Sequence, residues 1–306
     1  MLNKKSALLC LTALFFFFGV GCDQQPLNNS ASQEPPIRLD RLQQLPSNPD
    51  QHGPETLRIG VGAILSQQGT AQSYQQLIDT VGRRMGKPAI LVQRKTYQEL
   101  NDLLARNLVD VGFICTGAYI EGLHKNTMSL LVVPQIKGKT TYQSFIIVPA
   151  ASKVSRFEEL RGKTFAFSDP LSNSGYHFPL TLLQSMGQQP EIFFGRTFFT
   201  YSHDRSIAAV MDGITDGAAV DSQVYEFAAK RNIDIRQKTR IILESQNFGI
   251  PPVVVPSSIA PEVKQQLKQI LLTLHLDPEG ISALTELGVD RFMEPDSRLY
   301  EGRLNE

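Results

Sequence analysis

Hydrophobic and polar positions change their spacing several times along the chain after Leu57. Short apolar runs rich in β-branched residues, typical of buried strands, alternate with longer segments in which apolar residues recur every three or four positions, typical of amphipathic helices. Because buried strands alternate with helices, we expect an α/β domain whose mainly parallel sheet is covered on both faces. The pattern predicts strands within 57–65, 89–95, 110–115, 130–136 and 144–150, and helices over 71–86 and 97–107.

A second block with the same alternation follows, and the C-terminal part adds two helices near 260–275 and 279–289. Extended stretches around 142–149 and 245–255 bracket this second block. They predict an inserted lobe joined to the first by two crossing strands, with lobe 1 at 57–145 plus 246–306, lobe 2 at 146–245, and a cleft between them. The block itself predicts strands at 164–169, 192–199, 217–222 and 240–245, and helices at 174–187, 204–213 and 222–231.

The N-terminal pattern differs from both blocks. Lys4 and Lys5 precede an uncharged run that is short for a membrane span and has the length of a signal peptide's apolar core. The run ends in Gly-Val-Gly-Cys22, which resembles a bacterial lipoprotein processing box with Gly19 where Leu is usual. We expect residues 1–22 to be a lipoprotein signal peptide and Cys22 to carry the lipid. An ordinary secretory peptide or an uncleaved anchor is the alternative.

Residues 23–56 are rich in Pro, Gln, Asn and Ser and contain no aromatic residue. Such a composition buries too little apolar surface to order itself, so we expect a flexible tether between the lipid and the folded part.

Charge and cysteine content narrow the function classes. The chain has 30 basic and 30 acidic residues, and 28 and 30 remain without residues 1–22. No basic excess is available to displace counterions, so we expect no nucleic-acid partner. With Cys10 and Cys22 in the N-terminal segment, Cys115 is the last cysteine and the mature protein has no intramolecular disulfide. We expect Cys115 to be a small buried hydrophobe rather than a nucleophile.

The stretch "FAFSDPLSNSGYHFP", residues 165–179, leaves an aromatic strand through Asp-Pro and reaches Ser-Asn-Ser-Gly before an apolar helix. Unsatisfied N–H groups of a first helical turn, together with hydroxyl groups, form an oxyanion site that needs no metal. Ser172, Asn173, Ser174 and Gly175 are therefore candidate ligand-binding residues. The alternative interpretation is a simple helix cap and turn.

Two further strand ends repeat this layout. In "FTYSHD", His203 follows an aromatic strand and begins a predicted helix, where an imidazole donates to an oxyanion and attracts it when charged. In "GAAVDS", Asp221 follows a short apolar strand, where its carboxylate accepts the proton of a protonated phosphate or phosphite and disfavours fully ionised sulfate. Helix capping is the alternative role for both residues.

Several loops together resemble a known family. The matching pieces include "LRIGV", "VDVGFICTGAY", "YQSFIIV", "LRGKTFAFSDPLSNSGYHFP", "YSHDRSIAAVMDGITDGAAVDS" and "SQNFGIPPVVV". From about 57 to 300 the chain resembles the phosphate, phosphite and phosphonate receptors of bacterial ABC importers, a branch of the type II periplasmic binding proteins. The chain departs from the family pattern at two places. It has Thr116-Gly117-Ala118-Tyr119 where the family commonly has Gly-Pro before Tyr, and it has Asn173 where the family commonly has Thr.

The resemblance implies two α/β lobes joined by crossing strands and a ligand cleft between them. It implies a small phosphorus oxyanion as the ligand and an ABC permease with its ATPase as partners. We expect a monomer on the periplasmic or cell-surface side, anchored to a bacterial membrane by lipid, without a cofactor or metal and without enzymatic activity. The implied ligand residues are those named above together with Tyr97, Thr116 and Tyr119 from the first lobe.

Other functions stay open at this point. A sensor that presents its ligand to a partner other than a permease fits the same pattern. A hydrolase with Ser174, His203 and Asp221 is a further alternative, although "SNSGY" is not a G-x-S-x-G elbow. A metal receptor is disfavoured because the five histidines show no paired ligand spacing.

Overall fold

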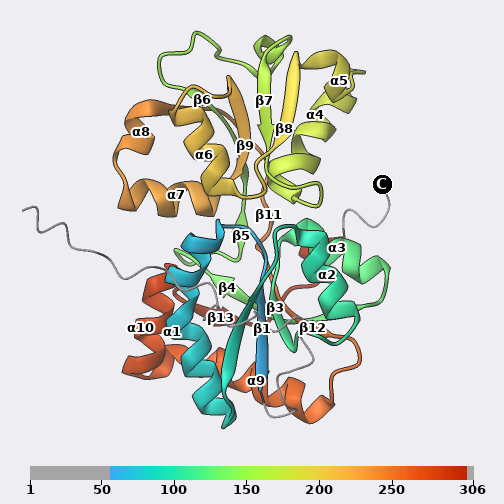
Figure 1. The fold of residues 1–306 in the computed structure, drawn as a ribbon, viewed down its shortest axis with the longest axis vertical. Helices are drawn as coiled ribbons and strands as arrows, with labels where there is room; N and C mark the ends of the chain where they lie inside the picture. The colour runs from blue at the N-terminus through green and yellow to red at the C-terminus, as the bar shows by residue number, and fades with distance from the viewer. Residues whose placement is uncertain (1–55, 302–306) are drawn as a thin grey trace, which may run out of the picture. The chain divides into compact units, whose positions relative to one another are not determined.

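The computed structural model describes residues 56–301, and the predicted signal peptide, tether and lipid site at Cys22 lie outside them. The described residues contain two large mixed β-sheets with helices packed on them, shown in Figure 1. We call each sheet with the helices packed on it a lobe, named by its number of strands. The boundaries predicted for the lobes stay a prediction. Within residues 56–301, no helix has the length and apolarity needed to cross a membrane.

The six-stranded lobe is built from both ends of the described chain, with the strand order β13-β4-β12-β3-β1-β2. Its strands are β1 (Leu57–Val61), β2 (Ala89–Gln93), β3 (Val111–Phe113), β4 (Met128–Gln135), β12 (Val253–Pro256) and β13 (Arg291–Met293). Its helices are α1 (Gln67–Met85), α2 (Tyr97–Ala105), α3 (Thr116–His124), α9 (Pro261–Thr273), α10 (Pro278–Leu287) and α11 (Arg298–Glu301).

The five-stranded lobe has the strand order β10-β6-β9-β7-β8. Its strands are β6 (Ser144–Pro149), β7 (Thr164–Phe167), β8 (Arg196–Phe199), β9 (Gly217–Asp221) and β10 (Thr239–Glu244). Its helices are α4 (Phe178–Ser185), α5 (Pro190–Phe193), α6 (His203–Met211), α7 (Ser222–Arg231) and α8 (Asp234–Lys238). A π-helical turn at Asn173–His177 leads into α4.

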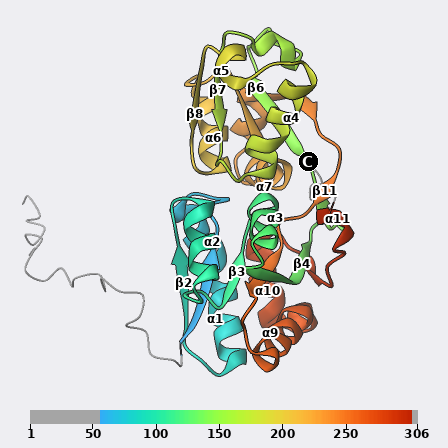
Figure 2. The same cartoon turned by 90° about the vertical axis from the view of Figure 1, so that its right-hand side faces the viewer.

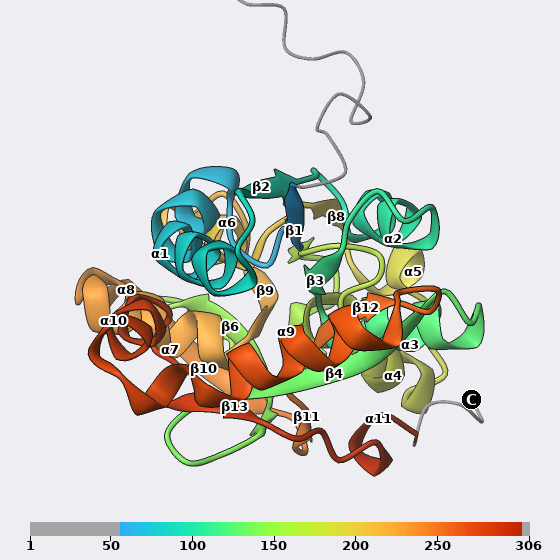
Figure 3. The same cartoon turned by 90° about the horizontal axis from the view of Figure 1, so that it is seen from below.

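Successive side chains along a single strand point to opposite faces of the sheet, so the core of each lobe has two layers. Val253 and Val255 face α1, α9 and α10, whereas Val254 faces the opposite layer with α2 and α3. Figure 3 shows α1 and α10 on one side of this lobe and α2 and α3 on the other. In β6, Ile146 packs toward α4 and α5, and Ile147 packs toward α6 and α7. Because pleated strands send successive side chains to opposite faces, both sheets are covered on both faces, as predicted.

Local capping signals fix several helix ends. Thr96 and Glu99 form a reciprocal capping box at the start of α2. Asp277 accepts a hydrogen bond from the N–H of Gly280 at the start of α10, and Gly288 ends that helix with a φ of 68°. A residue with positive φ is disfavoured unless it is glycine, which explains why α10 ends there.

The mainly parallel sheet predicted from the sequence is confirmed in part, because most strands of each sheet run in one direction but reversed strands make both sheets mixed. β1 is parallel to β2 and β3, but β12 runs antiparallel to β3 and β4. β7 is parallel to β8 and β9, but β6 runs antiparallel to β9 and β10. Strands that return from the other lobe enter each sheet in the reverse direction, and hydrophobic spacing carries no information on strand direction.

Two other predicted elements are shorter than expected. Residues 190–193 form a helical turn beginning at Pro190, so the strand predicted over 192–199 is restricted to β8. Between the lobes, β5 (Thr141–Tyr142) and β11 (Phe248–Gly249) form a two-stranded antiparallel ladder, which Figure 2 shows near α11. The predicted crossing strands are thus limited to this ladder, because β6 and β12 belong to the two large sheets.

Candidate ligand-binding site

The starts of several helices meet where the two lobes touch. The N–H of Tyr97, the first residue of α2, donates to Asp169 Oδ2 at 3.1 Å, and the N–H of His203, the first residue of α6, donates to the carbonyl of Ile64 at 3.0 Å. The N–H of Ser66, which caps α1, donates to Asp204 Oδ1 at 2.9 Å. Helix N-termini carry partial positive charge, so this junction suits an anionic ligand.

The Ser-Asn-Ser-Gly segment forms the tip that the sequence predicts. Ser172 is the cap residue, and its Oγ accepts a hydrogen bond from the N–H of Gly175 at 3.0 Å. Asn173 donates from Nδ2 to the Tyr142 hydroxyl at 3.1 Å. The carbonyl of Ser174 accepts from the Ser144 hydroxyl at 2.6 Å. Capping therefore uses the Ser172 hydroxyl, while the Ser174 side chain takes no part in it.

Gly175 is required by close packing rather than by an unusual backbone angle. A Cβ atom at this position would lie 1.6 Å from Ser168 Oγ and 3.0 Å from His203 Cε1. Only glycine allows the tip to approach the ends of β7 and α6 this closely.

His203 is buried, and one tautomer of the ring is selected by its partners. Its Nδ1 accepts a hydrogen bond from the N–H of Asp221 at 3.0 Å, so the proton of the neutral ring lies on Nε2. Nε2 is 3.4 Å from Ser172 Oγ. Burial lowers the His203 pKa from 6.5 to about 4, opposed by the charge of Asp204. At neutral pH His203 is therefore an uncharged donor, and the attraction considered for a charged imidazole does not operate there.

Asp221 has the capping role that was the alternative considered for it, and its carboxyl group is buried. Its Oδ1 accepts from the N–H groups of Gln223 at 2.7 Å and Val224 at 3.2 Å, which caps α7. Burial raises the Asp221 pKa from 3.8 to about 7, although these two hydrogen bonds lower it. Near neutral pH the carboxyl group therefore exchanges between a proton acceptor and a proton donor.

Unpartnered polar atoms gather around this tip. Five side-chain atoms from these segments are buried and have no hydrogen-bond partner among the described residues. A buried hydroxyl without a partner costs roughly 1–3 kcal/mol, so several of them in one region are unfavourable for the protein alone. The five atoms are Tyr97 OH, Ser168 Oγ, Asn173 Oδ1, Ser174 Oγ and Ser202 Oγ.

The three residues predicted from the first lobe have different environments. Tyr97 is buried with a free hydroxyl and joins the tip through its N–H. Thr116 donates its hydroxyl to the carbonyl of Gly249 at 2.8 Å, so it ties α3 to the crossing ladder. Tyr119 does not join the tip, because its ring packs edge to face on Tyr300 at 5.2 Å within the core.

Sequence reasoning missed several residues of this junction. Ser168 and Asp169 directly follow β7, as Asp221 ends β9, and this position at a strand end is the signal that could have found them. Ser202 directly precedes the predicted His203. The role of Tyr142 as the partner of Asn173 has no local signal, since it depends on the crossing ladder.

The geometry does not support nucleophilic catalysis. In a Ser-His-Asp triad the histidine Nε2 accepts the serine proton, and its Nδ1 donates to the carboxylate. Here Nδ1 of His203 is an acceptor and its partner is the main-chain N–H of Asp221. Burial also raises the Cys115 pKa to about 11, so this thiol stays protonated at neutral pH. Among residues 56–301, no cluster of three or more His, Cys, Asp or Glu could hold a metal ion.

A cavity of about 980 Å³ is lined in part by Asp221, whose N–H donates to His203 near the tip. Its lining comes from the loop after β1, from α1, α7 and α10, and from the segments around 134–137 and 250–252. The lining includes Ile64, whose carbonyl accepts from the His203 N–H. It does not include Tyr97 or the Ser172–Gly175 tip. The tip and the cavity are therefore neighbouring compartments.

Comparison with known families gives one match over most of the chain. Residues 59–300 match the family described as the periplasmic substrate-binding protein of phosphonate ABC transporters. The phosphate-import protein PhnD of Mycolicibacterium smegmatis is 24% identical over 255 residues, which cover 80% of this chain and 77% of that protein.

Solved structures show the same fold at low identity. A binding-protein component of an ABC phosphonate transporter from Pseudomonas aeruginosa superposes with a TM-score of 0.75 at 20% identity, covering 80% of this chain and 83% of the other. PhnD1 from Prochlorococcus marinus, solved in complex with methylphosphonate, gives a TM-score of 0.74 at 17% identity, covering 84% and 97%. These likenesses confirm the predicted two-sheet α/β fold of periplasmic binding proteins.

Proposed function

The chain belongs to the family of periplasmic substrate-binding proteins of phosphonate ABC transporters, and from this premise we propose that it binds a small phosphorus oxyanion at the Ser172–Gly175 tip. Phosphonate, phosphite and phosphate share the tetrahedral oxygen arrangement that such a tip would recognise. The observation that carries the proposal is the group of buried, unpartnered polar side chains around Ser174 and Tyr97.

The proposed contacts follow from the donors at the junction. The hydroxyls of Ser174, Tyr97 and Ser202 and the Nε2–H of His203 would each donate to a ligand oxygen. These groups are uncharged, so they stay buried without a counterion, and they become more effective when the lobes exclude water. A ligand that satisfied them would convert the cost of their burial into binding energy.

Asp221 would select among anions by their protons. With a pKa of about 7, its carboxylate accepts a hydrogen bond from a ligand that keeps a proton near neutral pH. When Asp221 is ionised, a ligand without a proton, such as sulfate, would meet a negative charge with no proton between them. This supports a phosphorus oxyanion over sulfate.

In the proposed cycle the lobes open, admit the ligand and close on it, and the closed form delivers the ligand to an ABC permease and its ATPase. The contacts from Asp169 to Tyr97 and from Asp204 to Ser66 belong to the closed arrangement. Two lobes at 57–145 plus 246–306 and 146–245 would move about the β5–β11 ladder. The protein would act as a monomer and without covalent chemistry.

Calorimetric titration of the full chain with phosphate, phosphite, methylphosphonate, aminoethylphosphonate and sulfate tests the proposal. At least one phosphorus compound should bind at one site per chain, and sulfate should bind at least tenfold more weakly. Absence of heat with all four phosphorus compounds would reject the ligand class, and a preference for sulfate would reject the role of Asp221.

We also propose that Cys22 is lipidated and anchors the protein on the extracytoplasmic side of a bacterial membrane. The charged start, apolar run and Gly-Val-Gly-Cys sequence support this. Cys22→Ser should move the protein from the membrane fraction to the soluble fraction, with Cys115→Ser as the matched control. Unchanged membrane partition of Cys22→Ser would count against lipid attachment.

A further inference from the structure

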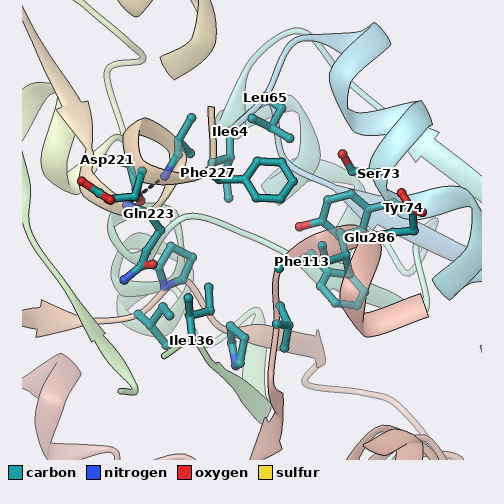
Figure 4. Close-up of a pocket in the computed structure, with 18 of the residues that line it drawn as sticks. Ile64, Leu65, Ser73, Tyr74, Phe113, Ile136, Asp221, Gln223, Phe227 and Glu286 are labelled. Atoms are coloured by element: carbon teal, nitrogen blue, oxygen red, sulfur yellow. Dashed lines mark hydrogen bonds between the residues drawn. The ribbon is translucent and has the colours of Figure 1, made fainter. Parts of the chain in front are cut away.

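The cavity beside the tip is larger than a bare oxyanion needs. Phosphate and methylphosphonate each have five heavy atoms, whereas about 980 Å³ lies at the upper end of the range for pockets that enclose a whole drug-sized ligand. Figure 4 shows Asp221 toward one side of this cavity, Tyr74 and Phe113 toward the other, and Phe227 between them. The cavity therefore extends from Asp221 toward Tyr74 and Phe113.

The cavity wall is largely aromatic and aliphatic. Tyr74 packs edge to face on Phe113 at 5.4 Å, and Phe113 packs on Phe292 at 6.1 Å. Phe227 and Leu65 line the same space. Aromatic rings favour edge-to-face and offset contacts with another ring, so this wall suits a flat apolar group.

The charged side chains of the lining neutralise one another. Glu226 pairs with Arg236 at 2.7 Å and with Lys137 at 3.6 Å. Arg231 pairs with Glu286 at 3.9 Å, and its guanidinium lies 4.1 Å from the centre of the Phe227 ring. The lining as a whole holds four basic and four acidic side chains, so with Asp221 ionised the cavity lacks the positive excess that a second anion would require.

Asp221 and Ile64 connect the two compartments. Asp221 lines the cavity, while its N–H donates to His203 at the tip. Asp221 and Tyr74 both line the cavity and lie toward opposite sides of it, as Figure 4 shows. A group attached to phosphorus at the tip would pass these two residues on its way into the cavity.

We propose that the ligand is an organophosphorus oxyanion with a ring-sized apolar substituent, whose phosphorus group occupies the tip and whose substituent occupies the aromatic cavity lined by Tyr74, Phe113 and Phe227. This inference rests on the proposed function and specifies its substrate class. Phosphite and phosphate would use the tip alone, and methylphosphonate would leave most of the cavity empty.

Competitive titration of the full chain with phosphite, methylphosphonate, phenylphosphonate and benzylphosphonate tests this inference. Burying a ring of phenylalanine size contributes about 1.5–3 kcal/mol, so an aryl phosphonate should bind roughly ten- to hundredfold more tightly than methylphosphonate. Binding of methylphosphonate with equal or weaker binding of both aryl compounds would overturn the inference and leave the proposed function intact. Failure of every phosphorus compound would reject both.

Two variants locate the substituent. We call the tighter binding of aryl phosphonates relative to methylphosphonate the aryl advantage. Leu65→Trp should fill part of the cavity and remove the aryl advantage, while methylphosphonate affinity changes less than threefold. Phe227→Ala removes a wall residue and should reduce the aryl advantage without blocking the cavity. Ile233→Trp is the matched control, because Ile233 is 63% exposed and does not line the cavity. An aryl advantage that survives both cavity variants, each with a normal unfolding midpoint, would overturn the assignment.

A final control separates a two-part ligand from an independent apolar site. Benzoate carries the ring without phosphorus and should bind at least tenfold more weakly than phenylphosphonate. Equal binding of the two would show that the cavity acts without the tip, which contradicts the inference.

Discussion

The tip and the cavity that meet at Asp221 differ in almost every physical property. The tip is closely packed and has polar atoms without partners, as the 1.6 Å approach that a Cβ on Gly175 would make to Ser168 and the free hydroxyl of Ser174 show. The cavity has open volume, aromatic walls and charges that are paired. Polar groups without hydrogen-bond partners thus lie on one side of Asp221, and an apolar cavity lies on the other. This arrangement suits a ligand with one polar and one apolar end.

The largest expected effect concerns the pH dependence of folding. The Asp221 pKa is raised from 3.8 to about 7, so its ionisation lowers the free energy of unfolding as pH rises through this interval. The His203 pKa is lowered from 6.5 to about 4, so its protonation lowers the free energy of unfolding as pH falls through that interval. The two contributions are of opposite sign and largely cancel between pH 4 and 6.5.

Substituting one of the two residues should reveal the pH dependence of the free energy of unfolding that the other contributes. Relative to wild type, the free energy of unfolding should rise by about 3 kcal/mol from pH 4 to 6.5 in Asp221→Asn, and it should fall by about 3 kcal/mol over the same interval in His203→Gln. Urea unfolding at four pH values measures both slopes. Parallel curves for wild type and both variants would show that neither group titrates as described.

The next effect distinguishes a ligand contact from a structural one. Ser174→Ala removes a hydroxyl that has no partner within the described residues, so ligand affinity should fall by roughly ten- to hundredfold while the unfolding midpoint stays the same or rises. Ser144→Ala is the matched control. Its hydroxyl donates to the carbonyl of Ser174 at 2.6 Å, so this variant should lose about 1 kcal/mol of stability. A loss of stability without a loss of affinity in Ser174→Ala would make Ser174 a structural residue.

The smallest effect tests contact between the lobes. A Cβ on Gly117 would lie 2.2 Å from the carbonyl oxygen of Leu171 in the other lobe, while alanine favours the helix in which Gly117 lies. Gly117→Ala should therefore reduce ligand affinity about tenfold through overpacking at the closed junction, with little change in the unfolding midpoint. In the control Gly122→Ala the added Cβ meets only the Met128 side chain of the same lobe, so affinity should be preserved. Equal affinities in the two variants would argue against closure at Gly117.

The fold and the tip could be predicted from the sequence better than the contacts between segments that are distant in the chain. Most strands and helices follow from local spacing, and the tip follows from a short loop that opens a helix. The antiparallel entry of β12, the place of Tyr119 in the core and the partnership of Asn173 with Tyr142 depend on contacts between distant segments. The neutral state of His203 has the same origin, because a main-chain N–H eighteen positions away selects its tautomer.

A crystal structure of the full chain soaked with methylphosphonate tests the central claim most directly. We predict a phosphorus atom at the tip, with its oxygens accepting hydrogen bonds from Ser174 Oγ, Tyr97 OH and His203 Nε2, and its methyl group directed past Asp221 toward the cavity. A phosphonate bound elsewhere, with Ser174 and Tyr97 still lacking hydrogen-bond partners, would contradict it.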